Sequence, residues 1–428
     1  MYTARDRARR APIEADALTI PHWLLEIFAW SLGTGTVGTL VVWTLVLAVT
    51  ERSVRAVPTL RLGQTLAEAD PPAGRVCVVI PAYNEARVIG GLIRSLANET
   101  YPQLSVVLAL DRCTDDTAAL ARAEIAGDAR FEIVEIDACP SDWAGKVHAV
   151  HSGVTRSRGA TDADYLLFAD ADTVFVPGCI AASLALMRQR KLQFLSLLST
   201  LTHDTWFERV VQTAAAFELM RQYPLTLANA VTDRRAFANG QYMLFTREAY
   251  AAIGGHEAVK SALLEDIALA RRMEAVKRNA GVFLADGLLR CRMYADWPQF
   301  RRGWKRIYTE AANRNARRLS VAAWRVRALG TLLPGCMFGC ALFGALATGR
   351  DARMGWTLLA LSLAAFVVWL VALLRVAAIA HAPLWTAPLH FVGAWLTAEL
   401  LSEAARDLRA RTPTRWGGRD YDLGTGKP

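Results

Sequence analysis

Cysteine is scarce in this sequence and is not arranged for cross-linking or for metal binding. The seven cysteines form no Cys-x-x-Cys pair, and their number is odd. Such a set argues against both a disulfide framework and a zinc knuckle, and it fits a reducing compartment best. The seven positions are Cys77, Cys113, Cys139, Cys179, Cys291, Cys336 and Cys340.

Other signatures are missing as well. No Gly-x-Gly-x-x-Gly follows the first expected strand, which disfavours a dinucleotide-dependent oxidoreductase. No internal repeat and no low-complexity segment occurs, so the chain does not read as a repeat protein.

Acidic residues are rare between Arg290 and Arg327. This stretch holds eleven arginine and lysine residues against two acids, a surplus equal to the net charge of +9 of the whole chain. Trp297, Phe300 and Trp304 lie among the cations, and an apolar run follows. We therefore expect basic amphipathic helices at a membrane surface over residues 291–327. Nucleic acid is not an expected partner, because no known binding motif accompanies the charge.

Long apolar runs lie near both ends of the chain. The run at 23–49 is too long for a signal-peptide core and lacks a small-residue cleavage site, so it predicts a retained transmembrane anchor. An N-terminal segment, 1–22, precedes it on the cytoplasmic or periplasmic side. The later runs at 329–347 and 356–380 are each long enough to cross a hydrocarbon core of about 30 Å.

A third C-terminal run, 383–401, contains a proline, a histidine and a glutamate, and is compatible with spanning, re-entering or lying flat. Residues 328–403 are thus predicted to form two or three transmembrane helices, followed by an arginine-rich tail, 404–428. If the central domain and the tail are both cytoplasmic, as the positive-inside rule suggests, an even number of spans must separate them. This count favours two.

The middle of the chain has an α/β pattern. Short apolar runs predict strands at 75–80, 104–110, 131–136 and 165–169, and the first two flank a predicted helix at 85–97. Strands that alternate with helices predict a mostly parallel, doubly wound sheet. We place this domain at residues 70–290.

Polar residues follow three of these strands. They are Pro81–Glu85 after the first strand, Asp111 after the second and Asp170-Ala-Asp172 after the fourth. Ligands bind beyond the carboxyl ends of the strands in such sheets, so this convergence predicts a site. Asp170 and Asp172 can supply the hard oxygen ligands that Mg²⁺ or Mn²⁺ prefers. The alternative is a capped turn, and the position directly after a buried strand favours the metal.

Five motifs follow one another along the central domain: Val79–Glu85, Asp111–Thr117, Gly145-Lys146, Asp170-Ala-Asp172 and Glu265-Asp266. They occur in the order seen in glycosyltransferase family two, which has the GT-A fold, and the sequence resembles this family. With Asp142–Lys146 and Asn239–Gln241 as further motifs, it is most similar to the bacterial membrane branch that includes hopanoid-associated and carotenoid (diaponeurosporenoate-type) glycosyltransferases.

The resemblance implies how a nucleotide-sugar donor is held. Pro81, Tyr83 and Glu85 would line the base and ribose, and Asp111 would accept a hydrogen bond from them. Lys146 would lie by the donor, and Asp170 and Asp172 would hold the metal and the diphosphate. Ordinary structural roles stand beside these: a strand-ending turn for 81–85, a helix cap for Asp111 and a surface lysine.

One position departs from the family. Where the family usually has paired acids followed by glycine and serine at the end of the second strand, this chain reads Leu110-Asp-Arg-Cys-Thr-Asp115. One acid is therefore missing. We interpret Asp115 as the residue that caps the following helix.

The resemblance assigns Asp266 as the general base that takes the proton from the acceptor hydroxyl. Chemistry requires such a base, because a hydroxyl is a weak nucleophile until it is deprotonated. The alternative is structural, since Glu265-Asp266 opens a predicted helix and the helix dipole favours acids there.

Membrane enzymes of this family commonly carry Gln-x-x-Arg-Trp on an interfacial helix. Here Gly303 separates the arginine from the tryptophan. Gln299 and Trp304 would contact the acceptor, and Arg302 would bind the diphosphate because arginine matches phosphate bidentately. Arg301 and Lys305 remain alternatives for that contact.

These expectations combine into one leading hypothesis. It is an inverting, metal-dependent glycosyltransferase in the bacterial inner membrane that moves one sugar from a nucleotide-sugar, by default a UDP-sugar, to a membrane lipid. Polyisoprenoids such as hopanoids or carotenoids are the favoured acceptors, and ceramide or diacylglycerol are competitors. The alternatives are a processive polysaccharide synthase and an inactive nucleotide-sugar-binding membrane protein.

Overall fold

The computed structural model describes residues 21–412, 414–416 and 419–421. A seven-stranded sheet in the order β3-β2-β1-β4-β8-β6-β9 forms the centre of the catalytic region. Neighbouring strands are parallel except that β8 runs antiparallel to both β4 and β6. This confirms the expected α/β class. The strands are β1 (Val76–Ala82), β2 (Leu104–Asp111), β3 (Phe131–Ile136), β4 (Tyr165–Phe168), β6 (Phe194–Leu198), β8 (Met243–Thr246) and β9 (Ala280–Leu284).

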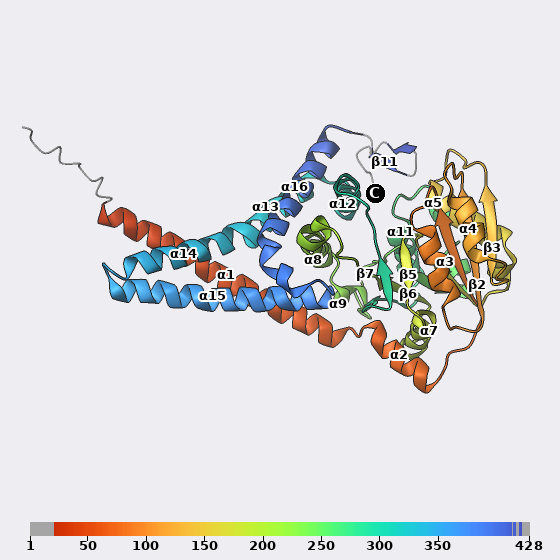
Figure 1. Cartoon of the computed structure of the whole chain (residues 1–428), viewed down its shortest axis with the longest axis horizontal. Helices are drawn as coiled ribbons and strands as arrows, with labels where there is room; N and C mark the ends of the chain where they lie inside the picture. The colour runs from red at the N-terminus through yellow and green to blue at the C-terminus, as the bar shows by residue number, and fades with distance from the viewer. Residues whose placement is uncertain (1–20, 413, 417–418, 422–428) are drawn as a thin grey trace, which may run out of the picture.

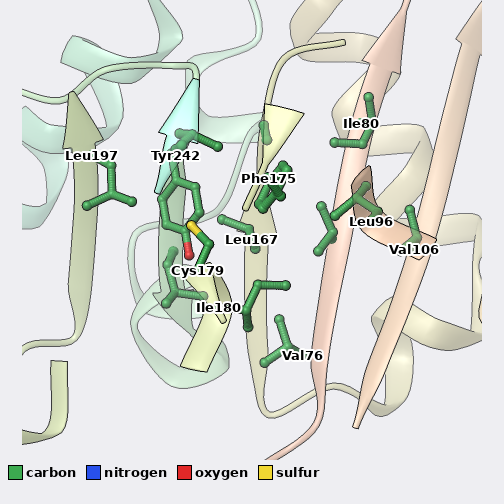
Figure 2. Packing of buried hydrophobic residues seen from close by; sticks show 14 of the residues in the cluster. Val76, Ile80, Leu96, Val106, Leu167, Phe175, Cys179, Ile180, Leu197 and Tyr242 are labelled. Carbon is green, nitrogen blue, oxygen red and sulfur yellow. The ribbon is translucent and has the colours of Figure 1, made fainter. Parts of the chain in front are cut away.

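Strand β1 is buried along its whole length, and its side chains alternate between two apolar cores. Val76, Val78 and Ile80 face a core shared with α2, α3 and α7, which Figure 2 shows from close by. Cys77 and Val79 face a core shared with α5, α10 and α11. The sheet is therefore covered on both faces. These helices are α2 (Leu60–Ala69), α3 (Ile89–Ala97), α5 (Gly145–Arg156), α7 (Cys179–Arg190), α10 (Arg247–Ala252) and α11 (Glu265–Ala275).

The first expected strand and helix differ from the structure at their junction. Strand β1 continues through Pro81 to Ala82, and α3 begins only at Ile89. Asn84 adopts a left-handed conformation (φ 56°), and its side chain accepts hydrogen bonds from the backbone of the loop after β2. These hydrogen bonds hold the chain in a turn at a place where the sequence predicted a helix.

A smaller sheet in the order β5-β10-β7 lies beside the carboxyl end of β4. Its strands are β5 (Thr173–Phe175), β7 (Thr200–Leu201) and β10 (Leu289–Cys291). A third sheet pairs β11 (Thr414–Trp416) with β12 (Arg419–Tyr421). The remaining elements of the catalytic region are α4 (Thr117–Ile125), α6 (Arg158–Asp162), α8 (Thr213–Gln222), α9 (Leu225–Ala228), the π-helical η1 (Glu208–Gln212) and the short 3₁₀ helix η2 (Glu257–Val259).

Three helical stretches of the described chain are long and apolar enough to cross a membrane: Trp23–Ala69, Ala316–Ala347 and Ala352–Ile379. They contain α1 (His22–Ala56), α14 (Leu333–Ala347) and α15 (Ala352–Ile379), which lie side by side and extend away from the sheet (Figure 1). The approach is close, since a Cβ on Gly35 of α1 would lie 2.6 Å from the Cβ of Cys336 in α14.

The third C-terminal run is not among these candidate spans. It forms a 3₁₀ segment, η4 (Leu384–Leu389), and α16 (His390–Arg409). Helix α16 packs on α12 (Trp297–Ala311), α13 (Ala316–Arg327) and η1. A π-helical segment, η3 (Ala328–Leu332), joins α13 to α14. The N-terminal segment 1–22 lies almost wholly outside the described residues, as do residues 413, 417–418 and 422–428 of the tail.

Candidate active site

The acidic pair lies in the turn between β4 and β5. Thr173 closes this turn by donating its hydroxyl to the Asp170 carbonyl (2.7 Å). Asp172 Oδ1 is buried and has no hydrogen-bond partner among the described residues. Burial and the neighbouring Asp170 charge raise the pKa of Asp172 to about 7. A buried carboxylate oxygen without a partner is costly, so the pair offers an oxygen ligand to a cation.

Lys146 connects the acidic pair to a second acidic region. Its Nζ lies 2.6 Å from Asp170 Oδ1 and 2.6 Å from Glu265 Oε1. The lysine is at the start of α5, and Glu265 begins α11. The Glu265 side chain is only 4% exposed, and the Lys146 side chain 18%. The structure thus makes Lys146 the shared counter-ion of two carboxylates, a position that a surface lysine would not occupy.

Asp266 lies beside this bridge. Its Oδ2 accepts a hydrogen bond from the Gly240 backbone (3.0 Å), and its Oδ1 accepts one from the Ile267 backbone (2.7 Å). A Cβ on Gly240 would lie 3.0 Å from Lys146 Nζ and 3.6 Å from Asp266 Oδ2, so Asp266 and Lys146 both lie against this glycine. Burial and the Glu265 charge raise the pKa of Asp266 to about 7. A carboxylate with such a pKa is suited to proton transfer near neutral pH.

The loops after β1 and β2 are joined to each other. Asn84 Oδ1 accepts hydrogen bonds from the backbone of Thr114 (2.8 Å) and Asp115 (3.3 Å). Asp115 in turn accepts hydrogen bonds from the backbone of Ala86 and Thr117, but the N-cap position of α4 is taken by Asp116, so Asp115 joins the two loops to the first residue of the helix and is not its cap residue. Tyr83 is held next to the end of β2 by these contacts.

Asp111 ends β2 with its side chain only 3% exposed, and it is paired with Arg112 rather than capping a helix. Pro81 is a buried residue of β1, opposite Ala109. Burial, then repulsion from Asp172 and Asp170, raises the pKa of Glu85 to about 7.

Helix α12 carries the residues expected to contact the acceptor and the diphosphate. Trp304 is 2% exposed and lies between Phe300 and Tyr308, with the rings tilted against one another, in a core shared with η1, α8 and α16. Gln299 accepts a hydrogen bond from the Ala295 backbone (3.2 Å), and Arg302 is exposed. The structure does not bring these three side chains together around the acidic pair.

The alternative cations of α12 are engaged elsewhere. Arg301 pairs with Glu403 (2.5 Å) and Lys305 with Asp407 (2.6 Å), both on α16. Gly303 lies against Tyr294, since an added Cβ would be 2.1 Å from the Tyr294 hydroxyl. The glycine that interrupts the family motif therefore makes room for this ring.

Arg306 is a cation of α12 whose charge acts on Asp170 of the acidic pair. It lies one turn after Gly303 on the same side of the helix. Burial raises the pKa of Asp170, and the charges of Lys146 and Arg306 oppose that rise. Burial also raises the pKa of Tyr294, against the influence of Arg306. Sequence reasoning missed Arg306, although its spacing of three residues from Gly303 could have indicated it.

A doubly wound sheet with an acidic pair after a central strand and a paired lysine and carboxylate beside it defines a glycosyltransferase of the GT-A type. The family model described as "Glycosyltransferase like family 2" matches residues 71–291, which is more than half of the chain. The chain belongs to this family. The expected class of enzyme, a glycosyltransferase of the hexosyltransferase type, is thereby confirmed.

Among curated proteins, the chain is similar to the 4,4'-diaponeurosporenoate glycosyltransferase of Staphylococcus aureus (strain MRSA252). The two are 27% identical over 266 residues, which cover 61% of this chain and 68% of the relative. Solved structures with a similar fold include a mannosyltransferase from Pyrobaculum calidifontis in complex with GDP-Man and Mn²⁺ (16% identity, TM-score 0.43, 80% of this chain and 98% of that one). Another is the glucosyl-3-phosphoglycerate synthase of Mycobacterium tuberculosis in complex with Mn²⁺, UDP and phosphoglyceric acid (18% identity, TM-score 0.37, 59% and 81%).

Proposed function

We propose that the protein is an inverting, metal-dependent glycosyltransferase that moves one sugar from a nucleoside diphosphate donor, by default a UDP-sugar, to a lipid acceptor at the cytoplasmic face of a bacterial membrane. One observation carries the proposal: Lys146 connects Asp170 to Glu265 directly beside Asp266. The connection places the candidate diphosphate-binding residues and the candidate base in one cluster. Direct displacement needs the base beside the acceptor hydroxyl and the diphosphate-binding residues beside the leaving group, on opposite sides of the anomeric carbon.

The residues present fit a divalent cation. Asp172 contributes the buried oxygen that lacks a partner, Asp170 lies one residue away from it, and Glu85 adds negative charge nearby. No group of three or more potential ligands is found in the described part of the chain, so phosphate and water oxygens would complete the coordination. Bound there, Mg²⁺ or Mn²⁺ would offset the charge that develops on the departing diphosphate.

Two cations of this chain are placed to bind the diphosphate. Lys146 is within reach at the base of the site, and Arg306 approaches from α12. Arg306 takes the role that the sequence assigned to Arg302.

Asp266 is the base in this proposal. The Gly240 and Ile267 amides hold its two oxygens, which orients the carboxylate. Its raised pKa lets it accept a proton from the acceptor hydroxyl near neutral pH.

The acceptor is proposed to be a membrane lipid, with polyisoprenoids ahead of ceramide and diacylglycerol. Two observations support this: the domain is continuous with three helices able to cross a bilayer, and the similar Staphylococcus aureus enzyme is named for a carotenoid acid. Contacts from Gln299 and Trp304 to the acceptor remain part of the proposal. Gln299 is the more accessible of the two.

The base role is tested with Asp266→Asn in purified protein, using UDP-sugar and membrane lipid extract. Sugar transfer should fall by at least about 100-fold, while equilibrium binding of UDP is retained. Asp142→Asn, which changes an exposed aspartate, is the matched control and should transfer sugar normally. Unchanged turnover in Asp266→Asn would rule out the base role.

Two further experiments address the cofactor and the acceptor. Excess EDTA should abolish transfer, and Mn²⁺ or Mg²⁺ should restore it; full activity in EDTA would refute the metal role. Lipid extracts from cells with and without the gene, compared by mass spectrometry, should differ by species one hexose heavier than an endogenous lipid. Absence of any such species would contradict a lipid acceptor.

A further inference from the structure

Arg112 and Asp111 form a two-pronged ion pair at the end of β2. Arg112 Nε donates to Asp111 Oδ1 (2.8 Å), and its NH2 group donates to Asp111 Oδ2 (2.6 Å). This is the planar geometry in which a guanidinium holds a carboxylate most firmly. The Asp111 side chain is 3% exposed and that of Arg112 is 24% exposed, so the arginine forms the accessible part of the pair.

The surroundings of Arg112 hold it in this position. Its backbone is left-handed (φ 48°), and its N–H donates to the Ile136 carbonyl (2.8 Å). A Cβ on Gly145 would lie 3.1 Å from the Arg112 NH2 group and 3.4 Å from Asp111 Oδ2. The left-handed conformation costs a residue with a side chain about 1 kcal/mol or more, so the contacts around Arg112 must maintain it.

An aromatic ring completes the arrangement. The Arg112 guanidinium lies 5.5 Å from the centre of the Tyr83 ring. Tyr83 belongs to the loop that Asn84 ties to Thr114, beyond Arg112 in the chain. The Asp111 carboxylate therefore lies at the end of β2, and the Arg112 guanidinium and the Tyr83 ring come from two loops that hydrogen bonds of Asn84 join.

This pair presents a hydrogen-bond acceptor next to donors in a fixed order. Uracil and guanine carry a ring N–H beside a carbonyl oxygen, so their edges present a donor next to an acceptor. Cytosine and adenine carry a ring nitrogen acceptor beside an amino group, which is the reverse order. A base whose ribose is held in place can donate its ring N–H to Asp111 and accept from Arg112 with its exocyclic oxygen. Only a keto base, uracil or guanine, can make both hydrogen bonds.

We propose that Arg112, together with Asp111, selects donors with a keto base, uracil or guanine, and rejects those with an amino base, cytosine or adenine. The inference rests on the proposed function, because it assumes that the base of a nucleotide-sugar donor lies at Asp111. It goes further by naming Arg112 as a residue that determines specificity.

The test measures, by calorimetry, the equilibrium binding of UDP, GDP, CDP and ADP to the full-length protein in detergent with Mn²⁺. The protein should bind UDP or GDP about 10- to 100-fold more tightly than CDP and ADP, the scale of one two-point base contact. Arg112→Ala should reduce the ratio of UDP affinity to CDP affinity by most of that factor. Arg122→Ala, which removes an exposed arginine of α4 paired with Glu135, is the matched control and should leave the ratio unchanged.

A second measurement needs no variant and so does not depend on how Arg112→Ala folds. The diphosphate of 4-thiouridine has a weaker acceptor at position 4, and it should bind the unaltered protein less tightly than UDP. Equal binding of UDP and CDP, or an unchanged ratio in a folded Arg112→Ala, would overturn the role of Arg112 and leave the transferase proposal intact. Failure of all four nucleotides to bind would overturn the proposed donor class, and the role of Arg112 with it.

Discussion

Replacement of Lys146 by methionine should destabilise the catalytic domain strongly. The lysine is the shared counter-ion of Asp170 and Glu265, each 2.6 Å away. Methionine keeps the length of the side chain and removes the charge, so two carboxylates are left facing each other. Breaking a buried ion pair by removing one partner typically costs about 3–5 kcal/mol.

The structure narrows this range. The Asp170 side chain is 29% exposed and still feels the Arg306 charge, whereas the Glu265 side chain is only 4% exposed. Glu265 alone therefore bears the full free-energy cost of an unpaired buried charge. We expect the loss of stability to lie at the lower end of the range, about 3 kcal/mol. For a domain of this size such a loss lowers Tm by roughly 6–12 °C.

The assay is thermal unfolding followed by tryptophan fluorescence in detergent, without metal or nucleotide. Lys260→Met is the control, because Lys260 pairs with Asp142 where both side chains are about half exposed, and its Tm should match that of the unaltered protein. The double variant Lys146→Met/Glu265→Gln removes both charges and should recover most of the loss. A Lys146→Met shift below about 2 °C would refute the reasoning.

Two more changes test the site and α12. Because burial and the Asp172 charge raise the pKa of Glu85 to about 7, Glu85 favours folding while protonated and loses that contribution as the pH rises. In metal-free buffer, Glu85→Gln should therefore raise Tm, and the gain should grow between pH 5 and pH 8; a gain independent of pH would contradict this. Gly303→Ala should cost about 1–3 kcal/mol despite the better helix propensity of alanine, because its Cβ would overlap the Tyr294 ring. Gly91→Ala in α3 is the control, because a Cβ there meets nothing within 4 Å, and it should not lower Tm. If both variants have a similar Tm, the Tyr294 ring moves aside at little cost and the expected loss of stability is wrong.

Much of the central sheet could be predicted from the sequence. Strand β3 has the expected bounds, and β4 differs by one residue at its end. Buried strands in a parallel sheet read as short β-branched apolar runs, so their positions are visible locally. The turn at Asn84 was not visible, because its conformation depends on hydrogen bonds to a loop that comes later in the chain.

The same division applies to the site. The order of the motifs indicated the family and named Lys146, Asp170 and Asp266, which the structure brings into one cluster. The sequence could not show that Lys146 also pairs with Glu265, since that contact joins the start of α5 to the start of α11.

Helix α12 shows most clearly what only tertiary structure decided. The sequence determined that this helix is basic and aromatic, and that a glycine interrupts its motif. It did not determine which face meets the catalytic domain. Packing of Trp304 into the core and of Gly303 against Tyr294 set that rotation, which leaves Arg302 exposed and Arg306 half-buried, with its charge acting on Asp170. Neighbours on a helix point about 100° apart, and only contacts with the rest of the fold determine which of them reaches the site.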